Sequence, residues 1–386
     1  MTKKSKVLSF TVGICLLGLL ISGGSAIAAN KNVPIPKMMT WMSYEVGSAL
    51  YMAVGFVSTT LYEKYGIKIR TVPAGADIPR VYPIRLKDAE VAFHGIGAYY
   101  MQEGTDDYSS MEWGPQPIRV LYYGQHAGLP LAVRKDSSIQ TVNDLKGKKL
   151  AAFPTRSLTT FCELSLAFAG LNWDQVVKVN VPSYSAAIRM VMEGKIDATI
   201  LNPTAPLAYE FEAMQYGLRY LPLPFNNKDG WARMKKHTPW IVPLKTSIGA
   251  GLSEGKPLET LSYPYPAVIA YDFLSDEKAY IITKLLVESY PDYAKKNKSL
   301  EAFWKPDSAL QLFDSFPLPM HRGSIQYFQE TGKWTSARNM KNDERIQHQD
   351  KLRKLWETTR EEGLAKQIKS NEFPQFWAKK RAEAGF

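Results

Sequence analysis

The chain has 386 residues, of which 45% are hydrophobic and 12% aromatic, and its formal net charge at pH 7 is +11. A chain of this length can bury the cores of two domains of ordinary size. Its lysines and arginines are spread along the sequence instead of gathering beside aromatic residues. This spread argues against nucleic-acid binding and is compatible with a mild attraction for small anions.

The first 28 residues have the pattern of a cleavable export signal. Three lysines near the N-terminus precede an apolar run over residues 7–21, and Ala26-Ile27-Ala28 supplies the small residues of a cleavage site. A permanent membrane anchor is the competing interpretation, but glycine, serine and alanine at the end of the run favour cleavage. Cys15 would leave with the signal, so Cys162 would have no disulfide partner. We therefore expect a periplasmic protein that is stabilised by its cores alone.

Two segments of similar pattern predict two lobes of one design. Residues 71–100 and residues 180–209 each contain a strand ending in Val-Pro, a polar turn, a short helix with Ile-Arg, an apolar strand and a Gly or Pro loop. Any two βαβ units share part of this pattern, because strands, loops and helices alternate in all such folds. The agreement in spacing favours two lobes, each with a parallel α/β sheet.

Hydrophobic periodicity and turn residues predict the remaining elements. In chain order, we expect a strand at 36–42, a helix at 43–65, strands at 118–123 and 129–133, a short helix, turn and strand at 142–153, a helix at 160–169, a strand at 195–201 and a helix at 209–215. Residues 247–266 are rich in glycine and proline and predict a crossing between lobes. A strand at 267–273 and an amphipathic helix at 276–290 are expected to return to the first lobe.

These elements divide the chain into five parts: a signal peptide (1–28), a first lobe (29–133), a second lobe (134–245), a return to the first lobe (246–300) and a helical C-terminal extension (301–386). The extension carries an intermittent apolar stripe of six residues: Ile346, Leu352, Leu355, Trp356, Leu364 and Ile368. We expect this stripe to pack against the body of the protein, and docking to a membrane or a partner is the alternative.

The order and spacing of several motifs resemble the solute-binding receptors of TRAP (tripartite ATP-independent periplasmic) transporters, in particular the TAXI family. The resemblance covers residues 38–293 and rests on Gly47, the Gly75-Ala76-Asp77 turn, 85-RLKDAEVAF-93, 144-DLKGKKLA-151, 193-EGKIDATILNPTAP-206 and 231-WARMKKHTPWIVP-243. It implies an α/β fold of two lobes, like a type II periplasmic binding protein. It also implies that a small carboxylate or acidic amino acid binds in the cleft and is delivered to a membrane permease.

Two loops depart from the family pattern, and both lie where the ligand is expected. The sequence has 75-GADIPRVYP-83 and 154-PTRSLTT-160 at positions where relatives carry loops rich in glycine and serine. The second loop places hydroxyl groups and Arg156 at the start of a helix, where free backbone N–H groups and a guanidinium can hold a carboxylate. The alternative is that Thr159 or Thr160 caps the helix and Arg156 points to solvent.

Candidate ligand contacts follow from the rule that open α/β sheets bind ligands at the carboxyl ends of their strands. In the first lobe Arg80 is preferred to Arg85, because Arg85 matches Arg189 in the repeat and is thereby indicated as structural. His94 is as well explained by a structural role, and Trp240 by packing. The candidates are Ser43, Tyr44, Gly75, Ala76, Arg80 and His94 in the first lobe, and Thr155, Arg156, Ser157, Thr159, Asn202 and Trp240 in the second.

One motif points to an enzyme instead. The stretch 251-GLSEG-255 matches the G-x-S-x-G nucleophile elbow, with Ser253 as the nucleophile, but the elbow needs a strand before it and a helix after it. Residues 247–250 make a poor strand, so we expect a crossing loop and no enzymatic activity. The five histidines are scattered and form no H-E-x-x-H motif, and we expect neither a metal nor a cofactor. We expect a monomeric hinged clamp for a small organic anion, and a periplasmic sensor is the further alternative.

Overall fold

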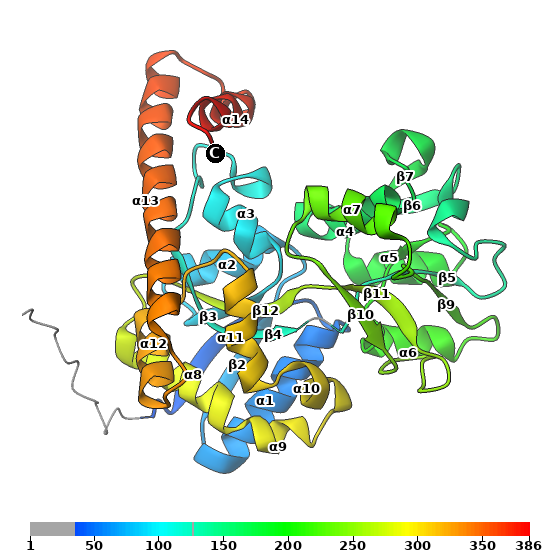
Figure 1. Cartoon of the computed structure of the whole chain (residues 1–386), viewed down its shortest axis with the longest axis horizontal. Coiled ribbons are helices and arrows are strands. Elements are labelled where there is room, and N and C mark those ends of the chain that lie inside the picture. The colour runs from blue at the N-terminus through cyan, green and yellow to red at the C-terminus, as the bar shows by residue number, and fades with distance from the viewer. Residues whose placement is uncertain (1–34, 126) are drawn as a thin grey trace, which may run out of the picture. The chain divides into compact units, whose positions relative to one another are not determined.

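Two sheets of related topology organise the part of the chain that the structure describes (Figure 1). The computed structural model describes residues 35–125 and 127–386, which belong to one compact unit. We call residues 35–125 and 264–386 lobe I and residues 127–263 lobe II, because each set carries one of the sheets. The expected signal peptide lies outside the described residues. Within them, no helix combines the length and the apolar character that a membrane span requires.

Lobe I contains a sheet of five strands in the order β2-β1-β3-β12-β4. Strand β1 (Met38–Ser43) pairs in parallel with β2 (Lys68–Pro73) and β3 (Val91–His94). Strand β12 (Pro264–Tyr271) lies antiparallel between β3 and β4 (Ile118–Gln125). Strands β3, β4 and β12 are apolar and buried almost throughout, which is typical of strands covered on both faces.

Lobe II contains a pair of strands, β7-β6, and a sheet of three strands, β8-β5-β9, and one bridge joins them in the order β7-β6-β8-β5-β9. Strands β6 (Lys149–Ala152) and β7 (Val177–Asn180) pair in parallel, and a parallel bridge from Leu150 to Ala198 joins them to β8 (Thr199–Ile200). Strand β5 (Leu131–Arg134) lies antiparallel between β8 and β9 (Leu218–Leu221). A hairpin of β10 (Val242–Thr246) and β11 (Leu258–Ser262) completes the lobe.

The two sheets repeat one topology, and this confirms the repeat predicted from the sequence. The run β1-α1-β2-α2-β3 in lobe I corresponds to β6-α4-β7-α5-β8 in lobe II, and in both lobes the first strand lies between the second and the third. In each lobe the next strand is antiparallel and comes from a crossing between the lobes: β12 in lobe I and β5 in lobe II. The helices of these runs are α1 (Ala49–Tyr65), α2 (Asp77–Arg85), α4 (Arg156–Phe168) and α5 (Tyr184–Met192).

Pairing between distant strands moves two of the expected lobe limits. Strand β5 was expected in the first lobe, which was to end at residue 133, but its partners β8 and β9 place it in the lobe II sheet. Residues 246–262 were expected to return to lobe I, but β11 pairs with β10, and Leu223 N donates to Glu259 O at 2.8 Å. The chain therefore crosses after β4 and again between β11 and β12. Local sequence patterns reveal a strand but not its partner, which explains both differences.

Helices α1 and α4 begin at residues different from those expected. Helix α1 begins at Ala49 instead of residue 43, because Ser48 Oγ accepts a hydrogen bond from Tyr51 N at 3.2 Å and so caps the helix. Helix α4 begins at Arg156, four residues earlier than predicted. Strand β8 is shorter than the predicted strand at 195–201.

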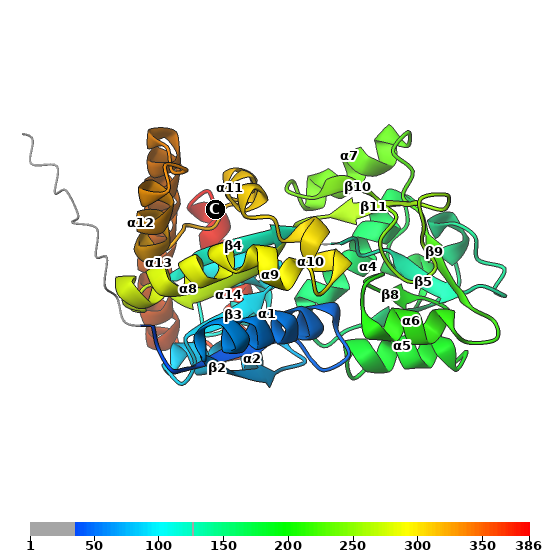
Figure 2. The same ribbon diagram turned by 90° about the horizontal axis from the view of Figure 1, so that it is seen from below.

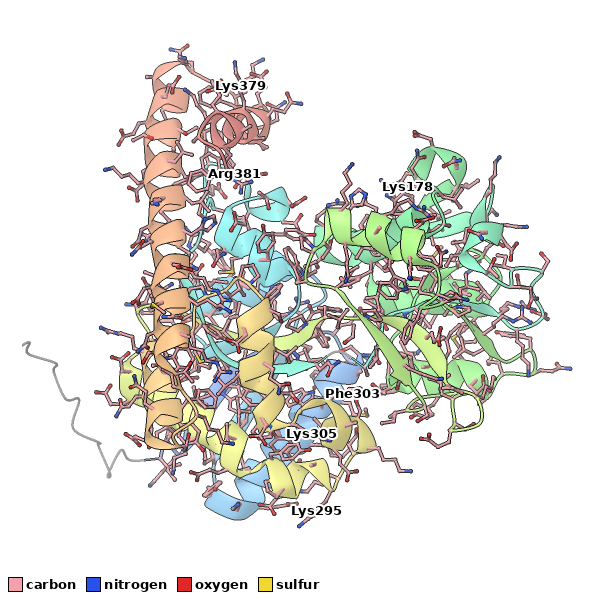
Figure 3. The ribbon with its side chains drawn as sticks, in the orientation of Figure 1. Lys178, Lys295, Phe303, Lys305, Lys379 and Arg381 are labelled. Carbon is pink, nitrogen blue, oxygen red and sulfur yellow. The ribbon has the colours of Figure 1, made fainter. Side chains whose placement is uncertain are left out.

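The C-terminal extension packs on the rest of lobe I through a cluster that includes Leu352, Leu355, Trp356 and Ile368, as predicted, whereas Leu364 of the predicted stripe is exposed. Leu352 of α13 (Ser336–Ala365) and Trp377 of α14 (Phe373–Glu383) belong to one buried cluster, and Trp377 Nε1 donates to Gly104 O at 2.7 Å. Arg381 faces lobe I and pairs with Glu103 at 2.8 Å, whereas Lys379 points away from it (Figure 3). Figure 2 gives a second view of the helices that cover the lobe I sheet.

The remaining elements are helices that surround the two sheets. They are α3 (Gly97–Glu103), α6 (Pro206–Glu212), α7 (Lys228–His237), α8 (Asp276–Glu288), α9 (Tyr290–Ala294), α10 (Lys298–Phe303), α11 (Pro306–Ser315) and α12 (Arg322–Glu330), with short 3-10 turns at Asp106–Tyr108, Val142–Leu145 and Trp173–Gln175.

Candidate ligand-binding cleft

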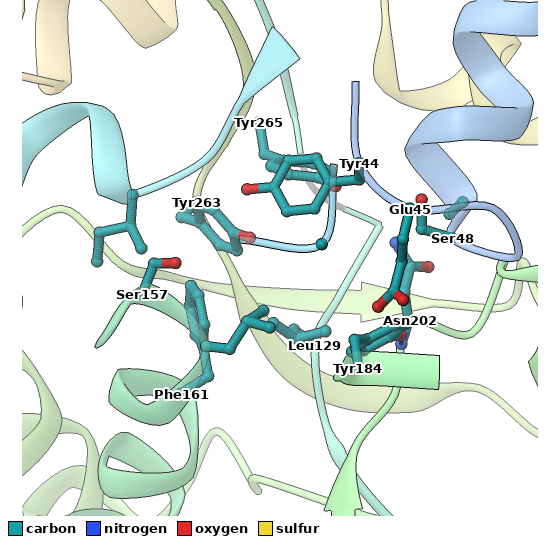
Figure 4. A pocket seen from close by; sticks show the side chains of 14 residues that line it. Tyr44, Glu45, Ser48, Leu129, Ser157, Phe161, Tyr184, Asn202, Tyr263 and Tyr265 are labelled. Atoms are coloured by element: carbon teal, nitrogen blue, oxygen red, sulfur yellow. Dashed lines mark hydrogen bonds between the residues drawn. The ribbon is translucent and has the colours of Figure 1, made fainter. Parts of the chain in front are cut away.

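A small cavity lies between the lobes at the carboxyl ends of their parallel strands (Figure 4). Its volume is about 40 Å³, which in this conformation admits a few water molecules. The lining residues are Tyr44, Glu45, Ser48, Ala49, Gly75, Ile96 and Tyr265 from lobe I, and Leu129, Ser157, Leu158, Phe161, Tyr184, Asn202 and Tyr263 from lobe II.

The topology explains why these residues meet. Six strand-to-helix junctions, three in each lobe, contribute residues to the lining: those before or at the starts of α1, α2 and α3, and of α4, α5 and α6. The first backbone N–H groups of a helix have no partner inside the helix and carry a partial positive charge. The cleft is therefore surrounded by groups that can donate hydrogen bonds to a ligand.

Aromatic rings form one wall of the cavity. The ring centroids of Tyr44 and Tyr265 are 5.7 Å apart, those of Tyr265 and Tyr263 are 5.5 Å apart, and Phe161 follows at 4.6 Å from Tyr263. Burial raises the pKa of the phenols of Tyr44, Tyr263 and Tyr265, so they stay protonated at neutral pH. Gly95 makes room for this wall, because a Cβ there would lie 2.8 Å from Tyr44 Oη.

Arg80 lies behind the tyrosine wall and is already paired. The Arg80 side chain is 1% exposed, its Nη1 donates to Asp77 Oδ1 at 2.8 Å, and its guanidinium stacks 3.5 Å from the centre of the Tyr44 ring. His94 Nε2 lies 3.8 Å from the same carboxylate oxygen. Gly97 permits this packing, because a Cβ there would lie 2.2 Å from Asp77 Oδ2. The structure thus places Arg80 and His94 in a buried cluster instead of in the cavity lining.

In this cluster, the effects of burial on the pKa values of Asp77 and His94 are opposed by the neighbouring charges. Burial alone would raise the pKa of Asp77, but His94 and Arg80 hold that pKa below its usual value. Burial lowers the pKa of His94 to about 4, although the Asp77 carboxylate opposes this shift. At neutral pH the cluster is therefore an Asp–Arg ion pair beside an uncharged imidazole.

Arg156 also points away from the cavity. It begins α4, and its side chain, 36% exposed, pairs with Asp106 at 3.1 Å and with Glu163 at 2.6 Å. Its backbone N–H donates to Asp107 Oδ2 at 3.4 Å. The first turn of α4 in lobe II thus already holds a carboxylate from lobe I. Burial, followed by the charge of Asp77, raises the pKa of Asp107 to about 6.

The hydroxyl groups near the start of α4 have different surroundings. Ser157 lines the cavity, and its hydroxyl contributes to the low pKa of Asp77. Thr155 is 4% exposed and lies just outside the lining. Thr159 Oγ1 donates to Phe153 O and accepts from Phe153 N, both at 3.1 Å, so Thr159 has a structural role. Thr160 bonds across the cleft to Tyr100 Oη at 2.8 Å.

A second carboxylate of lobe I meets a helix of lobe II. Glu45 Oε1 accepts a hydrogen bond from Ser185 N, in the first turn of α5, at 3.1 Å. Ser185 Oγ in turn donates to Val46 O at 3.4 Å. Glu45 also lines the cavity, on the side opposite Ser157 in Figure 4.

Four of the twelve predicted site residues line the cavity: Tyr44, Gly75, Ser157 and Asn202. The others lie outside its lining: Ser43, Ala76, Arg80, His94, Thr155, Arg156, Thr159 and Trp240. Trp240 packs against Tyr99 at 4.4 Å and Phe316 at 5.3 Å between ring centroids, as the packing alternative predicted. Lining residues outside the twelve include Glu45, Tyr184 and Tyr265, and of these Glu45 directly follows Tyr44 at the expected edge of the first strand. The repeat could have pointed to Tyr184, because it is the first residue of α5, and α5 is the equivalent in lobe II of α2, which begins at Asp77 beside the predicted Gly75 and Ala76.

The two-lobed α/β fold expected from the sequence is confirmed by the strand order and by the alternation of strands and helices in both lobes. The chain belongs to the NMT1-like family, whose profile matches residues 43–332 and so includes both lobes. No curated protein sequence matches the chain.

Solved structures with distant similarity include several ligand-binding proteins. The aliphatic sulphonate binding protein SsuA from Escherichia coli shares 15% identity over 83% of this chain and 88% of its own, with a TM-score of 0.43. The alkanesulfonate-binding protein SsuA from Xanthomonas axonopodis pv. citri, bound to MOPS, shares 14% over 79% and 94%, with a TM-score of 0.41. An ancestral arginine-binding protein bound to arginine shares 15% over 69% and 99%, also at 0.41. What those proteins bind does not identify a ligand for this chain.

Proposed function

We propose that the protein is a periplasmic solute-binding protein that captures a small organic anion, either a carboxylate or an acidic amino acid. It would deliver this solute to the membrane permease of a TRAP-type transporter. The observation that carries the proposal is the cavity between two lobes of repeated topology, at which six strand-to-helix junctions converge.

The donors around the cavity support binding of an acid. Ser157 stands at the start of α4, where backbone N–H groups and the helix dipole favour a negative charge. The phenol groups of the tyrosine wall are protonated at neutral pH and can donate to carboxylate oxygens. A solute carboxylate at the start of α4 would compete with Asp107, which now accepts from Arg156 N.

A hinged clamp would admit the solute, because the cavity is too small for it in this conformation. Drug-sized ligands occupy pockets of roughly 300–1,000 Å³. Two crossings connect the lobes, and Glu45–Ser185, Asp106–Arg156 and Tyr100–Thr160 are among the contacts that hold them together. Breaking these contacts would open the cleft, and the bound solute would restore closure.

The TRAP-type permease is proposed from the sequence resemblance, together with export by the N-terminal signal. A periplasmic sensor that uses the same clamp is the alternative partner system. The hydrolase alternative loses its main support, because Ser253 lies between strands β10 and β11 and no helix follows it, as a nucleophile elbow would require.

The test is a thermal-shift screen of the purified protein against carboxylates, amino acids and neutral sugars. We expect at least one acid to raise the melting temperature in a concentration-dependent way, since a ligand that binds only the native state stabilises it. Ser157→Ala should weaken the best hit several-fold, whereas Ser165→Ala, in the same helix but outside the cavity lining, should not. A neutral sugar that outranks every acid would contradict the proposal, as would the absence of any hit.

A further inference from the structure

The charge of the cavity differs from what a simple anion would need. Among the described residues that line it, Glu45 is the one with an ionisable acidic or basic side chain apart from the tyrosines, and it is acidic. Both nearby arginines are committed elsewhere: Arg80 pairs with Asp77, and Arg156 pairs with Asp106 and Glu163. A dicarboxylate would therefore meet a carboxylate without a free guanidinium to offset it. Close like charges in a partly desolvated site repel each other strongly.

The surroundings of Glu45 suit a positive charge. One of its oxygens accepts from Ser185 N, and the other, Oε2, lies on the side of Gly75, which also lines the cavity. The rings of Tyr44, Tyr184, Tyr263 and Tyr265 line the same small space. The faces of aromatic rings carry negative electrostatic potential and attract ammonium and guanidinium groups. A carboxylate beside several such rings is a cation site by its chemistry.

The cavity also has two different ends. Figure 4 shows Ser157, at the start of α4, and Glu45 on opposite sides, with the tyrosine rings between them. One end offers hydroxyl and helix N-terminal donors, and the other offers a carboxylate acceptor. A solute that satisfies both ends carries an acidic group and a basic nitrogen.

We propose that Glu45 binds a cationic nitrogen of the solute and is the residue that excludes acids lacking one. This inference rests on the proposed function and narrows its ligand class to compounds with a protonated amine, a quaternary ammonium or a guanidinium group. Selectivity arises in both directions: the nitrogen gains a charge-assisted hydrogen bond or a close ion contact, while a second carboxylate is repelled.

The experiment measures affinities by calorimetric titration for matched pairs that differ in the nitrogen: glutamate with glutarate, 4-aminobutyrate with butyrate, and glycine betaine with 3,3-dimethylbutanoate. The best nitrogen-bearing compound should bind at least tenfold more tightly than its partner. The first two pairs test primary amines, and the third tests quaternary ammonium. A fourth pair, 4-guanidinobutyrate with butyrate, tests guanidinium, so the result also identifies the kind of nitrogen.

Three variants separate recognition from closure. Glu45→Gln should reduce the affinity for the nitrogen-bearing compound at least tenfold and leave its nitrogen-free partner unchanged or tighter. Glu45→Asp, which keeps the charge, should retain part of the preference. Asp106→Asn is the matched control, because it also removes a carboxylate that joins the lobes but does not line the cavity. It should change both members of a pair equally.

The outcomes distinguish this proposal from the proposed function. If acids bind but the nitrogen gives no advantage, or if Glu45→Gln and Asp106→Asn behave alike, Glu45 serves closure only and the inference is wrong, while solute binding stands. If no compound in this panel or in the wider screen binds, both proposals fail. Circular dichroism and the melting temperature of each variant show whether a loss of binding follows from unfolding.

Discussion

Lobe I and lobe II share one topology but present different chemistry to the cleft. Lobe I supplies carboxylates: Glu45, Asp106 and Asp107 reach the boundary between the lobes, and Asp77 lies directly behind it. Lobe II supplies mainly donors at helix starts, such as the N–H groups of Arg156 and Ser185. The repeat thus sets where the cleft lies, and the substitutions at equivalent junctions set what it can bind.

The carboxylates of lobe I help to hold the two lobes together. Two carboxylates of lobe I accept hydrogen bonds from first-turn N–H groups of α4 and α5 in lobe II, at 3.4 and 3.1 Å. Negative charge is stabilised at these positions by the helix dipole. The closed conformation is therefore held in part by groups of the protein that stand where a ligand anion would be favoured. In the proposed clamp, ligand binding and closure would draw on the same donors.

The largest effect is expected from breaking the buried ion pair of lobe I. Asp77→Asn preserves the shape of the side chain but leaves Arg80 charged and 1% exposed without its carboxylate. Removing one partner of a buried pair typically costs about 3–5 kcal/mol, because the other charge stays desolvated. We expect this loss in the free energy of unfolding, measured by urea denaturation.

Lobe II provides the matched control for that prediction. Asp136 pairs with Arg134 at 2.6 Å, but the two side chains are 51% and 32% exposed. Exposed pairs contribute about 0–1 kcal/mol, so Asp136→Asn should leave the denaturation midpoint nearly unchanged. Equal losses in the two variants would show that burial does not distinguish the two pairs.

A second, smaller effect is expected on acidification, again from lobe I. Burial lowers the pKa of His94 and of His321 to about 4, from an ordinary value near 6.5. Between these values the unfolded chain binds more protons than the folded chain, so stability is present above about pH 6.5 and is lost as pH falls toward 4. Each histidine can account for on the order of 2–3 kcal/mol of this loss.

The measurement is the melting temperature as a function of pH for the protein and for His94→Gln. The variant starts from lower stability, because the imidazole no longer fills its buried site, but its melting temperature should fall less between pH 6.5 and pH 4.5. A parallel pair of curves would contradict the assignment.

The sequence predicted the fold better than the site, and particular residues show why. The βαβ runs around α2 and α5 follow from local periodicity, and both were predicted. The pairing of β5 with β8 and β9 depends on residues far along the chain, and it was missed. Local information determines which element forms, whereas the partner of an element is a property of the whole fold.

The candidate arginines show the same limit for the site. Arg80 and Arg156 were expected in binding loops, and the structure places Arg80 in α2 and Arg156 at the start of α4. Whether an arginine is free for a ligand depends on its partners. Asp77 is three residues from Arg80 on the same helix, so that pair had a local signal. Asp106 is 50 residues from Arg156, and only the folded structure reveals their ion pair.

The smallest expected effect tests the contact between the lobes at α4. Because burial raises the pKa of Asp107 to about 6, the folded protein retains its proton over a range in which the unfolded chain has lost it. Stability therefore changes with pH in the direction opposite to that of the histidines. Below the pKa of the unfolded chain, near 4, this carboxyl group costs no stability. It costs progressively more as pH rises to about 6, and the cost is constant above that. Since the group is partly exposed, solvent screening limits the cost to on the order of 1 kcal/mol.

Asp107→Asn removes this titration while keeping an oxygen that can accept from Arg156 N. The free energy of unfolding of the variant, relative to that of the unmodified protein, should therefore be about 1 kcal/mol more favourable at pH 7 than at pH 4. Urea denaturation at both pH values measures this difference. Asp106→Asn, one residue away, is the control, because it removes a neighbouring carboxylate that contacts α4 and leaves Asp107 in place. It should not reproduce this gain. If Asp107→Asn also strengthens the binding of an acid at pH 7, the solute and Asp107 compete for the start of α4. If its affinity is unchanged, Asp107 holds the lobes together at a place the solute does not reach.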